Sequence, residues 1–386
     1  MIVCEIAVPT RDSFEPSWVM EQSDQIRLAE ALDVLGTDDF HMPLALGVHS
    51  LRRQLDSWRV SLVAVDGVAA DQLPVGPHGL PELSWEAERA PERGRVLAAA
   101  GLTGHVHENT TLAELHVVVA REHRRRGVGR LLLQAAEQVA AGRGCTTLQC
   151  WTDHPQVPGE QGSGRQPTLS PPTGFGTIAL DDPATAFALA HGYALEQCER
   201  HSVCPLPGDD DVLEQLWNQS LPHAEGYQLR TIVDELPEEL LEPFAAMMRH
   251  FTEEMPSAGL DSEPEDWTPQ RVRRAEEARR ATGVRSLTTV AMDLASGAMA
   301  ASTNITTDPA HDEVCYQQHT VVDAGHRGHR LGLLTKIKNH RAVGEHFRQR
   351  RRLHTWNAGE NRWMLAINDQ LGFVAGVTEG AWQKRL

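Results

Sequence analysis

The sequence predicts an α+β (α/β) fold made of two similar tandem domains, each a mixed, mostly antiparallel sheet flanked by helices. Three observations support this prediction. The chain has 386 residues, more than one hydrophobic core usually accommodates. Each half has the same order of patterns: helices, strands, a long helix, then a strand, a shorter helix and a closing strand. A segment of the first half also recurs in the second half at constant spacing.

The composition is that of an ordinary globular protein, with 41% apolar residues. A net charge of −17 argues against nonspecific binding of nucleic acid, which needs a basic surface. No run of 18 apolar residues and no signal-peptide pattern is present, so no membrane span is expected. The six cysteines are not spaced as CxxC, which favours free thiols and no metal site. We therefore expect a cytoplasmic protein.

The first domain is predicted to span residues 1–205. Its expected elements, in order, are helices over 13–36 and 48–58, a strand over 60–66, two strands within 95–120, a long helix from Gly127 to Ala141, a strand over 146–152, a helix from about Asp182, and closing strands within 194–206. A loop rich in Pro, Gly and Ser fills much of 153–181.

An acidic segment with several Pro and Gly residues, 206–225, is predicted to be the linker, followed by a second domain over 226–386. In that domain Thr268 is expected to cap a helix with Pro269 at its first position. The other expected elements are a helix over 236–252, strands over 285–293, 297–306 and 313–322, a long helix from near Arg330, a strand over 352–357, a helix from Asn361 to Leu371, and a closing strand.

The internal repeat follows from a constant offset of 203 positions. Seven residues within a 16-residue segment are identical at that offset: His116/His319, Val118/Val321, Val119/Val322, His123/His326, Arg124/Arg327, Gly129/Gly332 and Leu131/Leu334. The identities centre on one strand–turn–helix, which indicates duplication of a domain.

Both copies place a cluster of cations immediately before a helix. The first cluster is Arg124–Arg126, and the second contains Arg327, His329 and Arg330. The start of a helix carries unpaired N–H groups and about half a positive charge, so it repels cations unless an anion is bound. The two clusters therefore predict two phosphate or pyrophosphate sites. Gly127 and Gly129 would let the backbone approach the anion closely.

The loop resembles the acetyl-CoA pyrophosphate loop of the GNAT N-acetyltransferases, which has the pattern Arg/Gln-x-x-Gly-x-Gly/Ala. Residues 124–129 match this pattern fully, and residues 327–332 match it except at Arg330. The segments 355–373 and 182–193 are similar to the part of the family that follows its splayed fifth strand. The tandem arrangement is similar to that of mycothiol synthase and other actinobacterial double-GNAT proteins.

The resemblance implies acetyl-CoA as acyl donor, held by the loop backbone, by a strand edge whose N–H polarises the thioester, and by an Asn that contacts the pantetheine. In this chain the implied CoA-binding residues are Val117, Val118, Val119, Arg124, Arg125, Arg126, Gly127, Val128, Gly129 and Arg130 in the first domain, and Val321, Val322, Arg327, Gly328, His329, Arg330, Leu331, Gly332 and Asn361 in the second.

The usual Tyr acid of the family is absent, because its positions hold Ala188 and Asn368. The candidate catalytic residues are instead Glu114, His116, Tyr316 and His319. Glu114 and His116 would share one face of a strand, and a partly buried Glu has a raised pKa suited to a base. His116 and His319 recur in the repeat, which equally fits structural histidines inherited by both copies.

The expected function is transfer of acetyl from acetyl-CoA to a small-molecule amine, directly in a ternary complex. The alternatives are a non-catalytic acyl-CoA-binding or sensing protein, or one catalytic domain paired with a degenerate one. Arg330 would either add a charge to the second phosphate site or fill it. An acidic segment, 253–267, could attract a cationic amine or be a solvated loop. The acceptor and the oligomeric state stay open.

Overall fold

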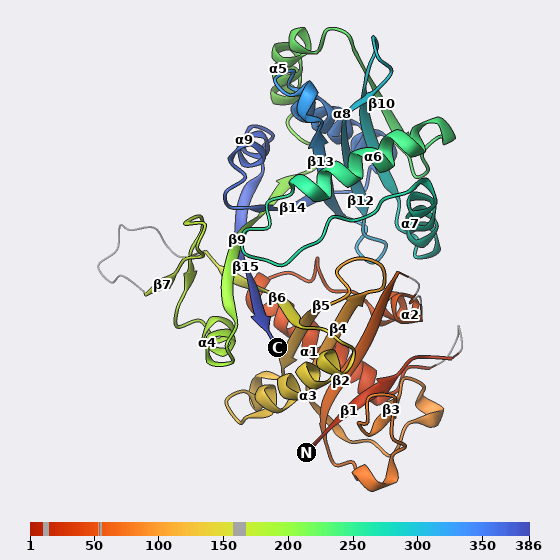
Figure 1. The fold of residues 1–386 in the computed structure, drawn as a ribbon, viewed down its shortest axis with the longest axis vertical. Helices are drawn as coiled ribbons and strands as arrows, with labels where there is room; N and C mark the ends of the chain where they lie inside the picture. Colours follow the sequence, from red (N-terminus) through yellow and green to blue (C-terminus); the bar gives the residue numbers. More distant parts are fainter. Residues whose placement is uncertain (11–14, 53, 55, 157–166) are drawn as a thin grey trace. The chain divides into compact units, whose positions relative to one another are not determined.

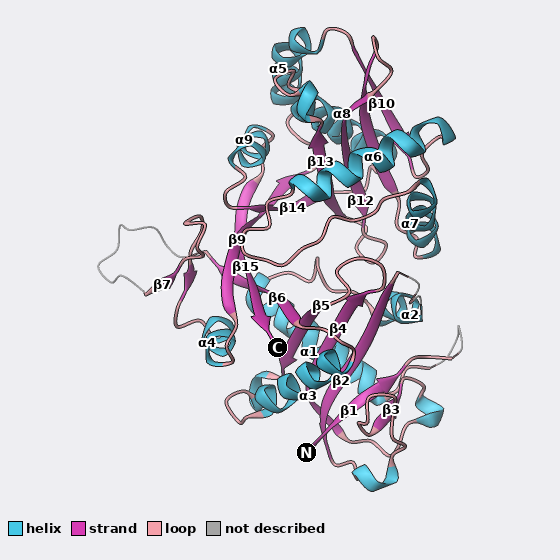
Figure 2. Ribbon diagram, in the orientation of Figure 1, coloured by secondary structure: helices cyan, strands magenta, loops and turns pink. Residues whose placement is uncertain are grey.

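The computed structural model describes residues 1–10, 15–52, 54, 56–156 and 167–386 and divides the chain into two compact units. Unit 1 comprises Met1–Gln197, Ala258–Ser262 and Glu379–Leu386, and unit 2 comprises Cys198–Ser257 and Glu263–Thr378. Each unit is a mixed sheet with helices on both faces, as predicted (Figure 2). No helix in these described ranges is long and apolar enough to cross a membrane.

The sheet of unit 1 has the strand order β6-β5-β4-β2-β1-β3, in which β6 runs parallel to β5 while β1, β2, β4 and β5 alternate in direction. The strands are β1 (Ile2–Ala7), β2 (Ser57–Asp66), β3 (Glu82–Ser84), β4 (Arg95–His105), β5 (Leu112–Val119) and β6 (Thr147–Pro155). Helices α1 (Trp18–Leu35) and α2 (Leu44–Arg52) pack on one face around buried Val63 and Val118. Helix α3 (Val128–Gly142) lies against β4 and β5, and α4 (Pro183–Ala190) follows later.

The segment 153–181, expected as a loop, contains a short hairpin of β7 (Thr168–Leu169) and β8 (Ile178–Ala179). Residues 157–166 of that segment lie outside the described residues. The helix expected over 48–58 is α2, which ends at Arg52, because β2 already begins at Ser57.

Unit 2 repeats this arrangement with the strand order β10-β11-β12-β13-β14-β9. Its elements are α5 (Asp210–Ser220), β10 (Tyr227–Val233), α6 (Glu238–Glu254), α7 (Pro269–Ala281), β11 (Ser286–Asp293), β12 (Met299–Thr307), β13 (Val314–Val322), α8 (Leu331–His346), β14 (Arg352–Ala358) and α9 (Arg362–Gln370). In Figure 1 α6 runs across the strands β12 and β13. Its apolar face and that of α7 bury Val290, Met299 and Val321, whereas α8 covers the opposite face of the sheet.

Two strands contribute to both units. Strand β9 (Ala194–Pro205) supplies its residues from Cys198 onward to unit 2, where they pair antiparallel with β14. Strand β15 (Val374–Arg385) supplies its last residues to unit 1, where Leu386 N donates to Thr146 O at 2.8 Å. Part of the closing strand of each repeat is therefore exchanged between the two units.

The segment 206–225, expected as a linker, is largely helical instead. Asp209 caps α5 by accepting from the N–H groups of Asp211 and Val212, so acidic residues interpreted as linker are helix-start residues. Leu213 is buried and Trp217 packs on the same core, a spacing of four that places both on one helical face. Thr268 does cap α7 as predicted, since its Oγ1 accepts from Arg271 N at 3.2 Å.

Candidate functional site

In both units the sheet splays apart in the middle. Strand β5 pairs with β6 only from Leu112 to Glu114, and β13 pairs with β14 only from Val314 to Tyr316. Beyond these points the strands diverge, and within the described chain no strand pairs with the edges at 115–119 and 317–322 on that side. Such an edge can pair with an extended ligand through main-chain hydrogen bonds.

The cationic loop follows the splayed strand and has the same backbone shape in each unit. A left-handed conformation occurs at Arg125 (φ 61°) and Gly127 (φ 81°), and again at the repeat positions Gly328 (φ 88°) and Arg330 (φ 54°). Arg330 caps α8 just as Gly127 caps α3. Its side chain is exposed, and its backbone has the left-handed conformation that Gly127 has in the first loop.

The second glycine of the motif is closely packed. Gly129 is buried, and a Cβ there would lie 3.2 Å from Phe187 and from Val119. The corresponding distance at Gly332 is 3.4 Å, to Val322. These contacts explain a glycine at position 129 without an anion. At Gly127 a Cβ would meet nothing within 4 Å, so Gly127 is where the backbone is open to a ligand.

The arginine at the start of each loop is tied to a carboxylate of the same unit. Arg124 pairs with Glu30, and its Nε donates to Val119 O at 3.0 Å. Arg327 pairs with Glu254. These contacts hold Arg124 and Arg327 to residues of their own unit. Arg125 and Arg126 are exposed, and the described residues give neither an ion pair.

Further side-chain contacts hold the second loop in place. Tyr227 Oη lies 2.9 Å from His326 Nδ1, and His329 Nδ1 lies 2.9 Å from the carbonyl oxygen of His223. The Tyr227 ring also contacts the His329 ring at 5.2 Å between centroids. Because His329 donates to a carbonyl, its other ring nitrogen is the one available to a ligand.

Strand β13 contains a bulge that β5 lacks. The pairing of β12 with β13 shifts register between Thr303 and Ile305, so that Gln318 and His319 together oppose Asn304. The β4–β5 ladder is regular over its whole length, with Gly101 opposite His116. A bulge leaves one residue outside the ladder and turns both of its side chains toward the same face. Here that face is the one covered by α6 and α7.

A cavity of about 370 Å³ lies under α6 and α7, entirely within unit 2. Its lining combines apolar side chains with polar ones, and both bulge residues contribute. The lining includes Phe244, Met248, Trp267, Glu276, Arg279, Asn304, Gln318 and His319. The volume is within the range of small-molecule sites.

The candidate base residues of unit 1 point to one exposed side of β5. Glu114 and His116 are both exposed, whereas Leu115 between them is buried. Desolvation by the surrounding chain raises the pKa of Glu114, against the attraction of His105 and Arg59. The same desolvation, followed by the charge of Arg27, lowers the pKa of His116 to about 4, although its side chain keeps a face open to solvent.

His319 has a similar environment in unit 2. Desolvation and then the charge of Arg279 lower its pKa to about 4. Its Nε2 lies 3.0 Å from Ser302 Oγ, and the rings of Phe244 and Phe251 pack against it. His319 is therefore a neutral imidazole at pH 7, able to pass a proton on but weak at holding one.

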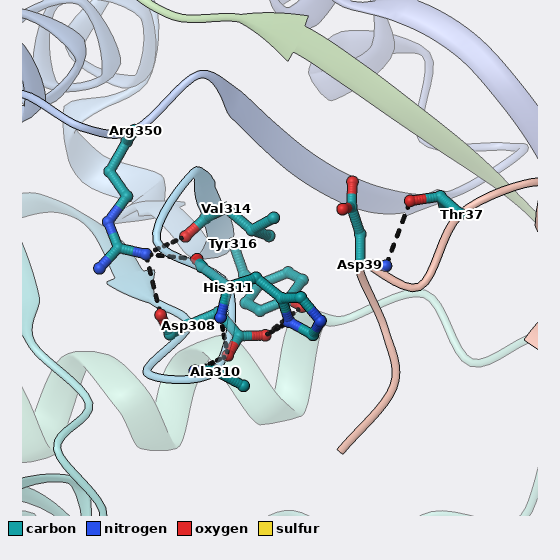
Figure 3. Close-up of polar contacts among 8 residues, drawn as sticks. All are labelled: Thr37, Asp39, Asp308, Ala310, His311, Val314, Tyr316 and Arg350. Carbon is teal, nitrogen blue, oxygen red and sulfur yellow. Dashed lines mark hydrogen bonds and ion pairs between the residues drawn. The ribbon is translucent and has the colours of Figure 1, made fainter. Parts of the chain in front are cut away.

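Tyr316 does not line the cavity, although it lies on the same strand. Figure 3 shows its hydroxyl directed at Asp308, to whose Oδ2 it donates at 2.9 Å. His311 Nδ1 lies 3.1 Å from the same oxygen, and Arg350 Nη1 donates to three carbonyls of the turn, those of Asp308, His311 and Val314 (Figure 3). This network stabilises the turn before β13.

Asn361, expected to contact pantetheine, caps helix α9: its Oδ1 accepts from Met364 N at 3.3 Å. Its amide N–H groups are thus the ones left for a ligand. Ala188 and Asn368, at the positions of the family's Tyr, are both buried. Asn368 Nδ2 donates to Asn357 Oδ1 at 2.7 Å, and its own Oδ1 is a buried acceptor without a partner in the described chain.

Comparison with known proteins identifies the fold. Residues 74–159 match the model of the Acetyltransferase (GNAT) family. The matched residues lie within unit 1. A tandem GNAT protein from the clavulanic acid biosynthesis pathway has the same fold over both units, with a TM-score of 0.68 and 23% identity, covering 99% of this chain and 98% of that one. The tandem GNAT fold predicted from the repeat is therefore confirmed.

Other solved GNAT structures are more distant. A GCN5-related N-acetyltransferase from Sphaerobacter thermophilus has a TM-score of 0.53 and 13% identity, covering 98% of this chain and 97% of that one. The glucosamine N-acetyltransferase region of a fungal multi-domain GH3 β-N-acetylglucosaminidase has a TM-score of 0.58 and 14% identity, covering 98% and 40%. None of the curated proteins matches the chain.

The sequence prediction missed most of the residues that line the cavity in unit 2. It included His319 and placed Gln318 on the same strand, but not Arg279, Trp267 or Asn304. Arg279 lies in an arginine-rich helix where the sequence gives no means of choosing one arginine over another. The bulge that turns Gln318 and His319 to one face also has no sequence signal.

Proposed function

We propose that the protein is an acetyl-CoA-dependent N-acetyltransferase that acts on a small-molecule amine by direct transfer in a ternary complex. The observation that carries this proposal is the recurrence, in both units, of a splayed strand followed by a loop with left-handed residues at the same two positions. Both units bind CoA in this proposal, and unit 2 performs catalysis.

The residues around each loop fit a CoA pyrophosphate. The left-handed positions turn successive N–H groups outward at the start of a long helix, an arrangement that binds anions. Arg125, Arg126 and Arg330 add exposed charge. The strand edges at Val117–Val119 and Val321–Val322 lie beside the loops and would pair with the pantetheine arm. Acetyl-CoA supplies the activated acetyl group; the chain supplies orientation and proton transfer.

Two proton movements accompany the transfer. The attacking amine must lose a proton while its nitrogen forms the new bond to the acetyl carbon, and the departing sulfur takes up a proton or leaves as thiolate. His319 forms a neutral relay: its Nε2 lies 3.0 Å from Ser302 Oγ, and its Nδ1 is left to take the amine proton and pass it to the departing sulfur. A thiol pKa near 8.5 makes a dedicated acid helpful rather than essential, which suits Ala188 and Asn368 at the acid positions.

Unit 2 is favoured as the catalytic unit because the bulge, the cavity and the relay meet at His319. In unit 1 the ladder beside His116 is regular. Glu114 there has the raised pKa of a base candidate, and it remains the proposed base if unit 1 is also active. The proposed setting is the cytoplasm, where the six free cysteines would stay reduced.

A non-catalytic acyl-CoA sensor is the second candidate, and the buried Asn368 at the acid position favours it. Release of free CoA thiol from acetyl-CoA across a panel of amines distinguishes the two. The proposal predicts amine-dependent release that His319→Ala lowers at least tenfold, with His250→Ala, an exposed histidine on α6, as control. Tight binding of acetyl-CoA without release for any amine would support the sensor.

A further inference from the structure

Arg279 is a guanidinium without a partner inside the cavity of unit 2. Among the described residues it makes no side-chain hydrogen bond or ion pair, although it is partly buried and lines the cavity wall. Burial lowers the pKa of Arg279, against the attraction of Glu276 and Asp234. A guanidinium has five N–H donors, and leaving them unused away from bulk water is costly.

The two carboxylates that attract Arg279 electrostatically, Glu276 and Asp234, are already bound to other groups. Glu276 accepts from Leu236 N at 2.8 Å and pairs with Arg273 at 2.7 Å. Asp234 accepts from Ser286 N at 3.0 Å and pairs with Arg285 at 2.7 Å. Each acid thus holds a different arginine, which leaves Arg279 as the donor that faces the cavity.

The rest of the cavity complements a molecule with one anionic end. Phe244, Met248 and Val272 provide an apolar wall. Trp267 also lines the cavity, and its indole N–H is buried without an acceptor in the described chain. At the bulge, Gln318 Nε2 donates to Thr306 Oγ1 at 2.9 Å, so the amide oxygen of Gln318 is left to accept from an amine.

A similar arginine occurs in unit 1. Arg27 of α1 makes no hydrogen bond or ion pair that the described residues provide, and the neighbouring carboxylate, Asp24, pairs with His41 at 3.1 Å. Arg27 acts on His116 as Arg279 acts on His319, since each lowers the pKa of its histidine. The two arginines come from different helices of the repeat, so their common placement is not inherited from one ancestral position.

The geometry points to an amino carboxylate as the acceptor bound in unit 2. Its carboxylate pairs with the fork of Arg279, its carbon skeleton lies against Phe244 and Met248, and its amine lies at the bulge beside Gln318 and His319. Carboxylate and guanidinium pair in a planar, two-bonded geometry that a lysine cannot reproduce. This inference rests on the proposed function, because it assigns the amine of that reaction.

The test compares amino carboxylates with their uncharged amides as acceptors for the full-length protein with acetyl-CoA. Glycine, β-alanine, γ-aminobutyrate, ε-aminocaproate and phenylalanine vary the distance between amine and carboxylate and the apolar bulk. We expect at least one acid to exceed its own amide about tenfold or more in kcat/KM, as the loss of one charged hydrogen-bonded pair implies. Equal use of acid and amide across the series would overturn the inference.

Two variants separate recognition from a structural role. Arg279→Met should lower kcat/KM for the acid about tenfold, mainly through KM, and leave the amide within about twofold. Arg280→Met is the matched control, because Arg280 is exposed and pairs with Glu235 on the helix surface. Removing an unpaired, partly buried charge should leave the melting temperature equal or higher, so a large fall in stability would indicate a structural arginine and contradict the inference.

If no acceptor is acetylated, a measurement of acceptor binding still tests the inference. Calorimetry with CoA present should detect the preferred acid, and not its amide, binding to the wild-type protein but not to Arg279→Met. If acetyl-CoA itself does not bind, the proposed function fails. If acetyl-CoA binds and only amines without a carboxylate are acetylated, the proposed function stands and the inference fails.

Discussion

Arg125 and Arg330 adopt the same left-handed backbone conformation, with φ of 61° and 54°, at the two different turning points of the repeated loop. Where unit 1 has Arg125, unit 2 has Gly328, and where unit 2 has Arg330, unit 1 has Gly127. Each loop therefore contains one glycine and one arginine at its left-handed positions, in opposite order. The two loops therefore have the same backbone shape. Each has one arginine at a left-handed position, but at a different point of the loop.

Replacing Arg330 by glycine tests what that residue contributes. A residue with a Cβ is strained in the left-handed region, so Arg330→Gly should raise the free energy of unfolding by about 0.5–1 kcal/mol after the entropy cost of glycine. Loss of an exposed charge should weaken acetyl-CoA binding in unit 2 by no more than about fivefold. Arg125→Gly is the matched variant in unit 1. Denaturant melts and calorimetry provide the two readouts, and a new or stronger site in Arg330→Gly would mean that Arg330 blocks the loop.

The repeat and its motif could be read from the sequence because a helix start with cations is unusual and appears twice. The first strand of each repeat, β1 and β10, could not be predicted from the sequence. Glu5 interrupts the apolar pattern of β1, yet it is buried and its Oε2 lies 2.5 Å from His78 Nδ1, a partner 73 residues away. Strand β10 lies at the edge of its sheet and has a single buried residue, Ile232, so its sequence has no clear apolar pattern. Long-range partners and strand exchange leave no local pattern.

Gly129 should be less tolerant of a methyl group than Gly332. In Gly129→Ala the new Cβ would meet Phe187 and Val119 at 3.2 Å, so α3 must shift away from β5 at roughly 1–3 kcal/mol in stability. Gly332→Ala meets its nearest neighbour at 3.4 Å and should cost less. Thermal melts compare the two, and acetyl-CoA binding in unit 1 should weaken with the shift of α3. A larger loss at Gly332 would contradict the packing described for these helices.

Lys336 is fully buried in unit 2, and its Nζ has no hydrogen-bond partner in the described chain. It lies 5.3 Å from the Phe373 ring, near Cys204 and His340. Burial lowers the pKa of Lys336 to about 7, while Cys204 acts in the opposite direction. An unfolded chain keeps a lysine pKa near 10.4, so between these values the unfolded state binds the extra proton.

This extra proton on the unfolded chain decides how stability changes with pH. Between about pH 7 and pH 10 the contribution of Lys336 to the free energy of unfolding should increase with pH, by roughly 1.4 kcal/mol per pH unit at most. Lys336→Met should be more stable than wild type at pH 7 and should lose this slope. Lys338→Met, on the same helix but partly exposed, is the control. Urea melts across this pH range measure both, and parallel pH profiles for wild type and Lys336→Met would contradict a buried neutral lysine.

The exchanged strands predict that neither half folds alone. A chain of residues 1–205 lacks the end of β15 that belongs to unit 1, and a chain of 226–386 lacks the β9 residues that pair with β14. We expect each half to be insoluble or unfolded by circular dichroism and amide exchange. Co-expression of 1–225 with 226–386 should restore a folded complex. Independent, cooperative melting of either half would show that the exchange is dispensable.

Calorimetric titration of the full-length protein with acetyl-CoA tests the central claim most directly. Two repeated loops of one shape, each beside a splayed strand, predict two binding sites per chain, with Arg125→Gly and Arg330→Gly each weakening a different one. Binding of a single equivalent would contradict the proposal that both units bind CoA. No binding of acetyl-CoA at all would contradict the account.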